Sequence, residues 1–464
     1  MPLVSQQQFE DSVLDTLLEY CKIPCLSPMF DNQWVENGHI EAATQLLASW
    51  AKKRALANFD VQIHRLEGRT PVITVTVEAT GGANGTCVLY GHLDKQPPLG
   101  EWSEGLSPYN PVRRGDRIYA RGVSDDGYST FGALLALEAM EANNIAHSRC
   151  VVLIEACEES GSPDLEFYLD ALKDHLGKVE LLICLDSGAV SYDRLWVTTS
   201  LRGLASIELT VKVLEQGRHS GMASGVVPSS FRILRQLIER VEDSTTGEIL
   251  LKELHVQIPE AVKEAAANTA AEFGDMYQHE FPLVPGLQLM GNSPAERILK
   301  KTWSPTLSVT GMGGIPTPDI AGNVLRAFTT ATLSFRLPPS ADSKLAEQAI
   351  IKAMTTDVPS NAQVTFKTEH ADGWNAPELA PWLAQALEEA STDAYGKAAG
   401  FTGEGGSIPF LASLGKRYPG VQFLATGVLG PDSNAHGIDE MLDIPMAVGV
   451  VNSVVTVLHA HANK

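Results

Sequence analysis

Four nearly continuous apolar runs, rich in β-branched residues, constrain the fold of this chain more than any other feature. The runs are Val72–Val77, Thr86–Tyr90, Cys150–Ile154 and Leu181–Leu185. This unbroken apolar pattern is typical of strands buried on both faces, as in parallel sheets covered by helices. Segments with helical spacing lie between and around them, at Phe9–Tyr20, Ile40–Ala57 and Ser129–Asn143. The sequence therefore predicts an α/β fold with a mostly parallel sheet.

A second pattern begins after Trp196. Strand-like and helix-like segments alternate there in the order β-α-β-β-α-β, at Ala205–Val213, Ser229–Val241, Leu307–Thr310, Ala327–Leu337, Asp342–Met354 and Ala362–Glu369. This order predicts a ferredoxin-like α+β module, interrupted by a helix-rich insertion at about Glu248–Gln278. The pattern of helical segments and buried apolar strands seen in the first part of the chain resumes at Pro377–Tyr395 and at the apolar run Val421–Ala425. We therefore expect an inserted domain at 199–372 within a first domain built from 1–198 and 373–464.

Composition narrows the class of protein. A chain of 464 residues exceeds what one core usually covers, and 44% hydrophobic with 20% charged residues is ordinary for a globular protein. The net charge of −21 argues against nucleic acid or an anionic membrane as partner. The N-terminus has no basic and then apolar segment typical of a secretory signal, and no apolar run reaches about 18 residues. We therefore expect a cytoplasmic globular protein.

Six dispersed cysteines fit this compartment. They are Cys21, Cys25, Cys87, Cys150, Cys157 and Cys184. They are dispersed, and three of them lie within apolar strand-like runs, a pattern that predicts buried, reduced, structural thiols rather than a disulfide framework.

Polar side chains follow several of the apolar runs. His92 and Asp94 follow one, the adjacent Glu158 and Glu159 follow another, and Asp186 ends a third. Active sites of parallel sheets lie beyond the carboxyl ends of the strands, so these side chains are expected to meet. Histidine and carboxylates are the ligands that zinc-like ions prefer.

The roles that these candidates could have differ, and some have a purely structural alternative. Asp94 can orient His92 through its second ring nitrogen, although such a pair alone is weak evidence. Asp125 is a candidate for a carboxylate that bridges two ions, whereas Asp126 could simply cap the following helix. Glu158 and Glu159 point opposite ways on an extended chain, so one can bind metal while the other faces water.

The remaining two candidates are the most ordinary in appearance. Asp186 could be a turn residue at a strand end instead of a ligand. His436 lies in the loop Asn434-Ala435-His436-Gly437, where a histidine is usually just a surface residue. They support a common site only through their order along the chain together with the other three segments, which contain His92, Asp125 and Glu158-Glu159.

These segments resemble the cocatalytic zinc amidohydrolase family that contains carnosinase, glutamate carboxypeptidase, aminoacylase and succinyl-diaminopimelate desuccinylase. The resemblance covers essentially the whole chain, including the inserted lid domain. It implies that His92 and Asp186 hold one ion, that Glu159 and His436 hold the other, and that Asp125 bridges them. It also implies that Asp94 orients His92, that Glu158 is the general base, and that a cis peptide joins Asp125 to Asp126.

Two positions depart from the family pattern. Gly127-Tyr128 stands where the family usually has a lysine after the paired acidic positions, and Gly437-Ile438-Asp439-Glu440 alters the usual end of the last motif. Neither change removes a ligand or the base, so they bear on the subfamily more than on catalysis.

The inserted domain contains further matches. Gly217–Gly221 resembles the family's lid motif, whose histidine, here His219, reaches a neighbouring subunit's site in dimeric members and stabilises the oxyanion. Asn323 and Arg336 resemble lid residues that contact substrate, Arg336 through a carboxylate; a strand-end salt bridge is the alternative. The loop Gly405-Gly406-Ser407 resembles the glycine-rich loop of the carnosinase-like branch, where backbone N–H groups could hold the substrate's carboxylate.

The expected function is hydrolysis of dipeptides or short peptides that have a free C-terminal carboxylate. The expected cofactors are two divalent ions per subunit, preferably Zn²⁺ with Mn²⁺ or Co²⁺ as alternatives, and a homodimer through the lid is expected from the resemblance. Deacylation of N-acyl amino acids is the close rival. A non-catalytic amino-acid-binding descendant and an unrelated structural protein complete the alternatives.

Overall fold

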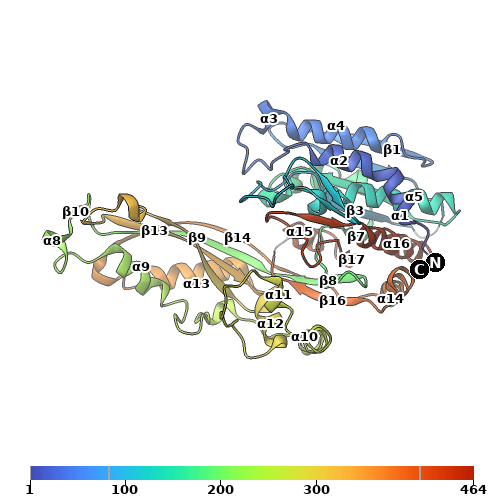
Figure 1. The fold of residues 1–464 in the computed structure, drawn as a ribbon. Helices are drawn as coiled ribbons and strands as arrows, with labels where there is room; N and C mark the ends of the chain where they lie inside the picture. Colours follow the sequence, from blue (N-terminus) through green and yellow to red (C-terminus); the bar gives the residue numbers. More distant parts are fainter. Residues whose placement is uncertain (1, 82–83, 407–408) are drawn as a thin grey trace. The chain divides into compact units, whose positions relative to one another are not determined.

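The computed structural model describes residues 2–81, 84–406 and 409–464. The chain divides into two compact units. Unit 1 contains Met1–Thr199, Ala376–Thr402 and Ser413–Lys464, and unit 2 contains Ser200–Asn375 and Gly403–Ala412. The expected domain boundaries are close to these, but the segment 403–412 clusters with unit 2 and not with the first domain. Figure 1 labels many of the elements of both units.

Unit 1 contains a six-stranded sheet in the order β1-β2-β6-β3-β7-β17. Its strands are β1 (Phe59–His64), β2 (Val72–Val77), β3 (Thr86–His92), β6 (Arg149–Glu155), β7 (Val179–Cys184) and β17 (Gln422–Ala425). β6, β3, β7 and β17 are parallel neighbours, whereas β2 pairs antiparallel with β6 and with β1. The prediction of a mostly parallel sheet is confirmed, and the four apolar runs form four of its strands.

Helices of unit 1 pack on this sheet and on one another. They are α1 (Gln6–Phe9), α2 (Asp15–Cys21), α3 (Trp34–Asn37), α4 (His39–Ala51), α5 (Ser129–Ala142), α6 (Leu165–Ala171), α7 (Lys173–Leu176), α14 (Pro381–Tyr395) and α16 (Ile444–Ala462). α5 contacts β3 and β6, and α16 packs against α5 and α14. One helix, α15 (Pro409–Arg417), belongs partly to each unit.

The α16 helix is long and apolar enough to cross a membrane by length and composition. However, 72% of its most apolar window is buried within the protein, among the residues of the unit 1 core. Its apolar character is therefore that of a core helix.

Unit 2 contains a four-stranded antiparallel sheet in the order β11-β13-β9-β14. Its strands are β9 (Gly203–Lys212), β11 (Thr306–Gly313), β13 (Phe328–Leu337) and β14 (Gln363–Ala371), and the helices α9 (Ser230–Ile238) and α13 (Ser343–Thr355) pack on it. This strand order is that of a ferredoxin-like module, as predicted. Alternating burial along β9 and β13 places one face of the sheet on the core of this unit.

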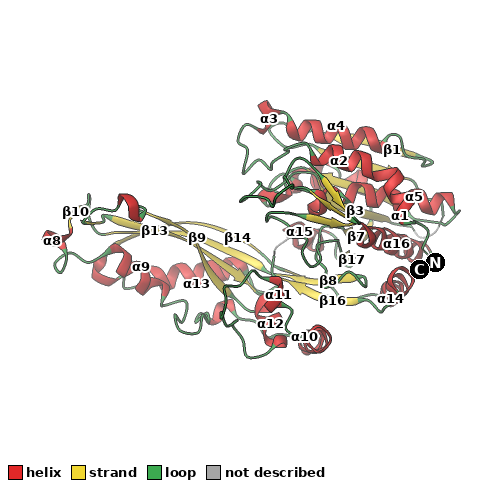
Figure 2. Cartoon of the chain, viewed as in Figure 1, coloured by secondary structure: helices red, strands yellow, loops and turns green. Residues whose placement is uncertain are grey.

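The helix-rich insertion of unit 2 is longer than expected. Its helices are α10 (Glu260–Phe273), α11 (Tyr277–Glu280) and α12 (Pro294–Trp303), so it extends to the start of β11. α10 packs against α12, and Ala266, Tyr277 and Ile298 form a small core between them. Figure 2 shows these helices in red beside the yellow strands of the four-stranded sheet.

Short strands complete the fold. One three-stranded sheet has the order β18-β5-β4, from β4 (Val112–Arg114), β5 (Arg117–Tyr119) and β18 (Met441–Asp443). Another has the order β15-β8-β16, from β8 (Trp196–Leu201), β15 (Trp374–Asn375) and β16 (Gly400–Glu404). β10 (Arg218–His219) pairs with β12 (Val324–Leu325), beside the one-turn helix α8 (Ser220–Ala223).

Candidate metal centre

Three polar segments meet at the carboxyl edge of the parallel strands in unit 1. His92 is the last residue of β3, Glu158 and Glu159 begin the short 3₁₀ turn after β6, and Asp186 lies two residues beyond β7. Because β6, β3 and β7 are neighbours that run in the same direction, their ends bring these side chains together. The structure thus places the strand-end residues where the sequence predicts them.

Asp125 lies between the two histidines of the site. Its Oδ1 is 3.2 Å from His92 Nε2, and its Oδ2 is 3.0 Å from His436 Nε2. His436 Nε2 is also 3.2 Å from Glu159 Oε2, and Asp186 Oδ2 is 3.7 Å from His92 Nε2. One carboxylate therefore faces two separate imidazole groups through its two oxygens, which is the geometry of a bridging ligand.

The imidazole of His92 is fixed by Asp94. His92 Nδ1 lies 3.1 Å from the backbone oxygen of Asp94 and 3.5 Å from its carboxylate, and both residues are fully buried. The other ring nitrogen, Nε2, faces Asp125 and Asp186. An acceptor on one nitrogen sets the tautomer that leaves the other nitrogen available for a metal ion.

Asp94 also positions the two adjacent glutamates. Its carboxylate oxygens accept the backbone N–H groups of Glu158 and Glu159, at 3.1 and 3.0 Å. Gln96 donates to Glu159 Oε2 at 2.8 Å. Asp94 therefore holds both His92 and the turn that carries the predicted base, which its sequence position alone did not indicate.

Two groups of ligand atoms in the described chain are compact enough to hold a metal ion. One consists of His92, Asp125 and Glu159, and the other of His92, Glu158 and Asp186, with all atoms of a group within 4.8 Å of one another. Glu158 thus supplies one of the possible ligand atoms itself, beside those of His92 and Asp186. Its assignment as the base stays a prediction.

The electrostatics of this cluster fit divalent cations. Burial raises the pKa of Glu158 and of Asp186, and burial together with Asp125 raises that of Glu159. Burial would lower the pKa of His92, but hydrogen bonds to Asp125 and Asp94 raise it well above its usual value. Crowded carboxylates therefore hold protons that divalent cations would replace, and two imidazoles with carboxylates form a donor set that suits zinc-like ions.

Glu440 and Arg121 connect the two loops of the site, and the sequence did not single them out as functional. Glu440 is fully buried, its Oε2 lies 2.7 Å from Arg121 Nη1, and its Oε1 accepts the backbone N–H of Asp125 at 3.1 Å. Arg121 Nη2 donates to the backbone oxygen of Gly437 at 2.6 Å. This pair therefore fixes Asp125 relative to the loop that carries His436. Arg121 and Glu440 lie 319 residues apart in the sequence, so the sequence alone did not indicate their contact.

The departures around Asp125 have a structural explanation. A Cβ atom at Gly127 would lie 2.3 Å from the backbone oxygen of Gly122 and 2.3 Å from the ring of Tyr20, so a lysine cannot occupy this position.

The peptide bond between Asp125 and Asp126 is cis, as the resemblance implied. Asp126 accepts the backbone N–H of His92 at 3.2 Å, and α5 has no side-chain cap, so the helix-capping alternative is wrong.

The described residues that are predicted to contact substrate lie in unit 2, where they form two separate sets. His219 and Asn323 belong to the first set: His219 pairs with Val324, and the backbone N–H of Ser220 donates to Asn323 at 2.8 Å. His219 is exposed, and its Nδ1 accepts from the backbone N–H of Gly221 at 3.1 Å.

The second set lies at the opposite end of the β9–β13 pair. Arg336 pairs with Leu204 near the start of β9 and with Thr306 at the start of β11. Gly405 and Gly406 are held by Arg202, which donates from Nε to the Gly405 oxygen at 3.1 Å. Ser407, also predicted to bind substrate, lies outside the described residues.

Fold and centre together define a metal-dependent hydrolase with an inserted α+β domain. A model of the peptidase family M20/M25/M40 matches residues 88–460, and the chain belongs to this family. The resemblance inferred from the sequence segments is thereby confirmed.

Individual relatives agree with this assignment. A cysteinylglycine-S-conjugate dipeptidase of Corynebacterium striatum is 26% identical over 415 residues, which cover 87% of this chain and 86% of that protein. A Cys-Gly metallodipeptidase of Schizosaccharomyces pombe is 25% identical over 439 residues, covering 91% and 90%. The crystal structure of human carnosine dipeptidase 1 matches with a TM-score of 0.77 at 19% identity, over 98% of this chain and 97% of that one, and so shares the fold.

Proposed function

We propose that this protein is a dipeptidase that uses two zinc ions per subunit and accepts dipeptides with a free C-terminal carboxylate. The observation that carries the proposal is Asp125, whose two oxygens face His92 Nε2 and His436 Nε2 at 3.2 and 3.0 Å. Glu159 and Asp186 complete one set of ligands around each imidazole. Relatives named as Cys-Gly dipeptidases support dipeptides as the substrate class.

The chain's own residues divide the chemistry among them. Divalent ions bound to these residues would polarise the amide carbonyl of the substrate and would lower the pKa of a water molecule. Glu158 takes the proton from the attacking water and returns it to the leaving nitrogen. Asp94 holds His92 and the backbone of Glu158 in place for this transfer.

Arg336 is proposed to bind the substrate's C-terminal carboxylate, together with the Gly405-Gly406 loop. Burial lowers the pKa of Arg336, since a cation is costly in a partly buried site, and a carboxylate partner offsets that cost. An Arg336→Lys variant is expected to raise KM more than it lowers kcat, because lysine cannot form the bidentate contact.

We also propose dimerisation through unit 2, which the separation of the two sets of predicted substrate-contacting residues supports. Arg336 and the His219–Asn323 set lie toward opposite ends of β13, and eight residues of a strand span about 26 Å. A dipeptide is about 7 Å long, so it cannot contact both sets of one chain. This supports a homodimer in which His219 serves the partner's substrate. The exposed apolar residues Val309 and Met312 on the edge strand β11 are available for such an interface.

Mixing two inactive variants tests this arrangement. His219→Ala lacks only the histidine and Glu158→Gln lacks only the base, so a mixed dimer has one complete site. Random reassembly is expected to restore about a quarter of wild-type activity, since half of the dimers are mixed and each has one intact site. Mixed dimers seen by native mass spectrometry that stay inactive would contradict the shared site.

The substrate class is tested by a panel. Cys-Gly, β-Ala-His and other dipeptides are compared with N-acetyl and N-succinyl amino acids, using metal-loaded protein with and without a chelator. We expect dipeptide turnover that a chelator abolishes and Zn²⁺ restores. Turnover of the acylated amino acids alone would assign the protein to the deacylases, and no turnover of either class would favour a non-catalytic binding protein.

A further inference from the structure

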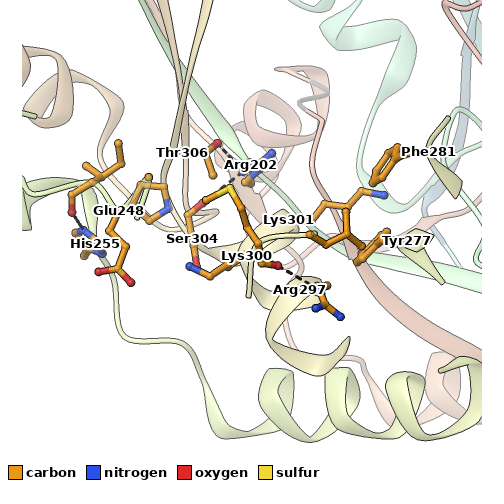
Figure 3. Close-up of a pocket in the computed structure, with 15 residues that line it drawn as sticks. Arg202, Glu248, His255, Tyr277, Phe281, Arg297, Lys300, Lys301, Ser304 and Thr306 are labelled. Atoms are coloured by element: carbon orange, nitrogen blue, oxygen red, sulfur yellow. Dashed lines mark hydrogen bonds between the residues drawn. The ribbon is translucent and has the colours of Figure 1, made fainter. Parts of the chain in front are cut away.

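A cavity of about 570 Å³ lies within unit 2, and none of the proposed metal ligands lines it. Its walls come from the insertion around α11 and α12 and from the start of β11, as Figure 3 shows. This volume falls in the range that small-molecule sites usually occupy.

Cationic side chains dominate the polar part of the wall. Arg202, Arg297, Lys300 and Lys301 line the cavity, and Glu248 is the one carboxylate among the described lining residues. This concentration of positive charge contrasts with the net charge of −21 for the whole chain. Clustered like charges repel one another, so their arrangement around a cavity favours an anion inside it.

Three of these cations differ in the distance to their carboxylate partner. Arg297 forms a 2.6 Å ion pair with Asp275, and Lys301 a 2.8 Å pair with Glu280. Lys300 lies 4.0 Å from Glu296, one helical turn earlier on α12, which is a weak contact. Lys300 is therefore the lysine whose charge is most available to a ligand.

Arg202 is the most deeply buried of the four cations. Among its contacts, the guanidinium donates to the Gly405 oxygen and to Thr306 Oγ1, both at 3.1 Å. Burial and the nearby cation of Arg336 lower its pKa to about 10. An environment that disfavours the cation to this degree is one that a bound anion would stabilise.

Aromatic and aliphatic side chains form the rest of the wall. The rings of Tyr277 and Phe281 stack at 5.8 Å between centroids, and the Lys301 ammonium lies 4.9 and 5.8 Å from them. Phe281 is 42% exposed and Met290 is 59% exposed, so both present apolar surface to a ligand in the cavity. A flat apolar group would cover this surface while its anionic group reached the cations.

We propose that this cavity binds a small amphipathic anion, a flat apolar body that carries one carboxylate, sulfonate or phosphate group. The anionic group contacts Lys300 and Arg202, and the body packs on Phe281 and Met290. The proposal does not depend on the metal chemistry, because all residues that line the cavity belong to unit 2.

The probe is 8-anilinonaphthalene-1-sulfonate, whose fluorescence rises in apolar surroundings. N-phenyl-1-naphthylamine has the same rings without the sulfonate and serves as the uncharged control ligand. We expect the sulfonate to bind with a stoichiometry of one and at least about fivefold more tightly than the neutral dye, since one charge–charge contact in a partly buried site is worth about that factor.

Charge reversal locates the site. Lys300→Glu is expected to weaken sulfonate binding by at least about tenfold, because attraction becomes repulsion. Lys367→Glu is the matched control: Lys367 is also a unit 2 lysine with a glutamate partner, at 3.0 Å from Glu208, and it does not line the cavity. Lys301→Met keeps the aliphatic stem, removes the charge, and gives a second variant in case Lys300→Glu unfolds, which thermal melting would reveal.

Two results would overturn the proposal. One is equal dye binding by wild type, Lys300→Glu, Lys301→Met and Lys367→Glu. The other is dye release from Glu158→Gln protein by a saturating dipeptide, because the dye would then occupy the substrate site. Binding that survives both metal removal and dipeptide supports a separate anion site, even if the proposed dipeptidase activity fails its own test.

Discussion

Asp125 and Asp94 show how single carboxylates build this site. Asp125 uses its two oxygens on two different histidines, and Asp94 uses its own on the backbone of Glu158 and Glu159. The strand-end positions of the candidate ligands His92, Glu159 and Asp186 could be predicted from the sequence, because each follows a recognisable apolar run, whereas Asp125 and His436 do not directly follow such a run. The roles of Gln96 and Arg121 could not be predicted, since they depend on contacts between distant segments.

Glu158→Gln is the variant that tests the base. Glutamine keeps the size of the side chain but cannot accept and return a proton, so kcat should fall by at least about 10³-fold. The metal content should stay at the wild-type value, because the proposed ligands are unchanged. A metal-loaded variant with near wild-type turnover would disprove the assignment.

Glu155 provides a pH-dependent contribution to stability. Burial raises its pKa to about 7 from 4.5, while Tyr90 and Ser162 donate to its Oε1. The folded protein thus holds a proton that the unfolded chain releases above pH 4.5. Stability from this group is fully present below pH 4.5 and is lost as the pH rises through 7, by about 3 kcal/mol in all.

Urea unfolding between pH 5 and 8 checks this expectation. A Glu155→Gln variant keeps acceptors for Tyr90 and Ser162 but does not titrate, so its free energy of unfolding should fall less steeply with pH than that of wild type. Both proteins must be in the same metal state. Parallel profiles for the two proteins would contradict the assigned pKa.

Among the elements, the apolar pattern predicts the strands that are buried on both faces better than the half-exposed strand β1. β3, β6 and β7 were predicted because both of their faces are buried. β1 was missed because it is a half-exposed edge strand whose polar and apolar residues alternate. The predicted helix Ile40–Ala57 ends at Ala51, before the exposed turn at Lys52–Lys53.

Glu440 connects two loops, so its substitution should affect both stability and the site. Glu440→Gln removes the partner of a buried arginine and weakens the hold on the Asp125 backbone. We expect a loss of about 3 kcal/mol in the free energy of unfolding. Metal affinity should fall as well, by about tenfold or more, because a support of the bridging ligand is lost.

Asp432→Asn is the matched control, since Asp432 lies in the same loop region but its side chain is 78% exposed. Its variant should keep wild-type stability within about 0.5 kcal/mol. Chemical denaturation and metal titration of the two variants give the comparison. A Glu440→Gln protein that behaves like Asp432→Asn would show that the network is dispensable.

In the molecule as a whole, the two units contain residues with different proposed roles. Unit 1 contains all of the candidate metal ligands, and unit 2 contains the predicted substrate-contacting residues and the cationic cavity. The reaction class could be predicted from the sequence because it depends on one compact donor set. Substrate preference could not, because its residues are dispersed over unit 2 and one of them, Ser407, is outside the described residues.

Metal stoichiometry is the decisive test of a two-ion centre that Asp125 bridges. Elemental mass spectrometry of metal-reconstituted protein should give about two equivalents of divalent ion per subunit for wild type. Asp125→Ala should bind less than about half an equivalent, since both ions lose a shared ligand. Wild type without bound metal, or an Asp125→Ala protein that retains two equivalents, would contradict the account.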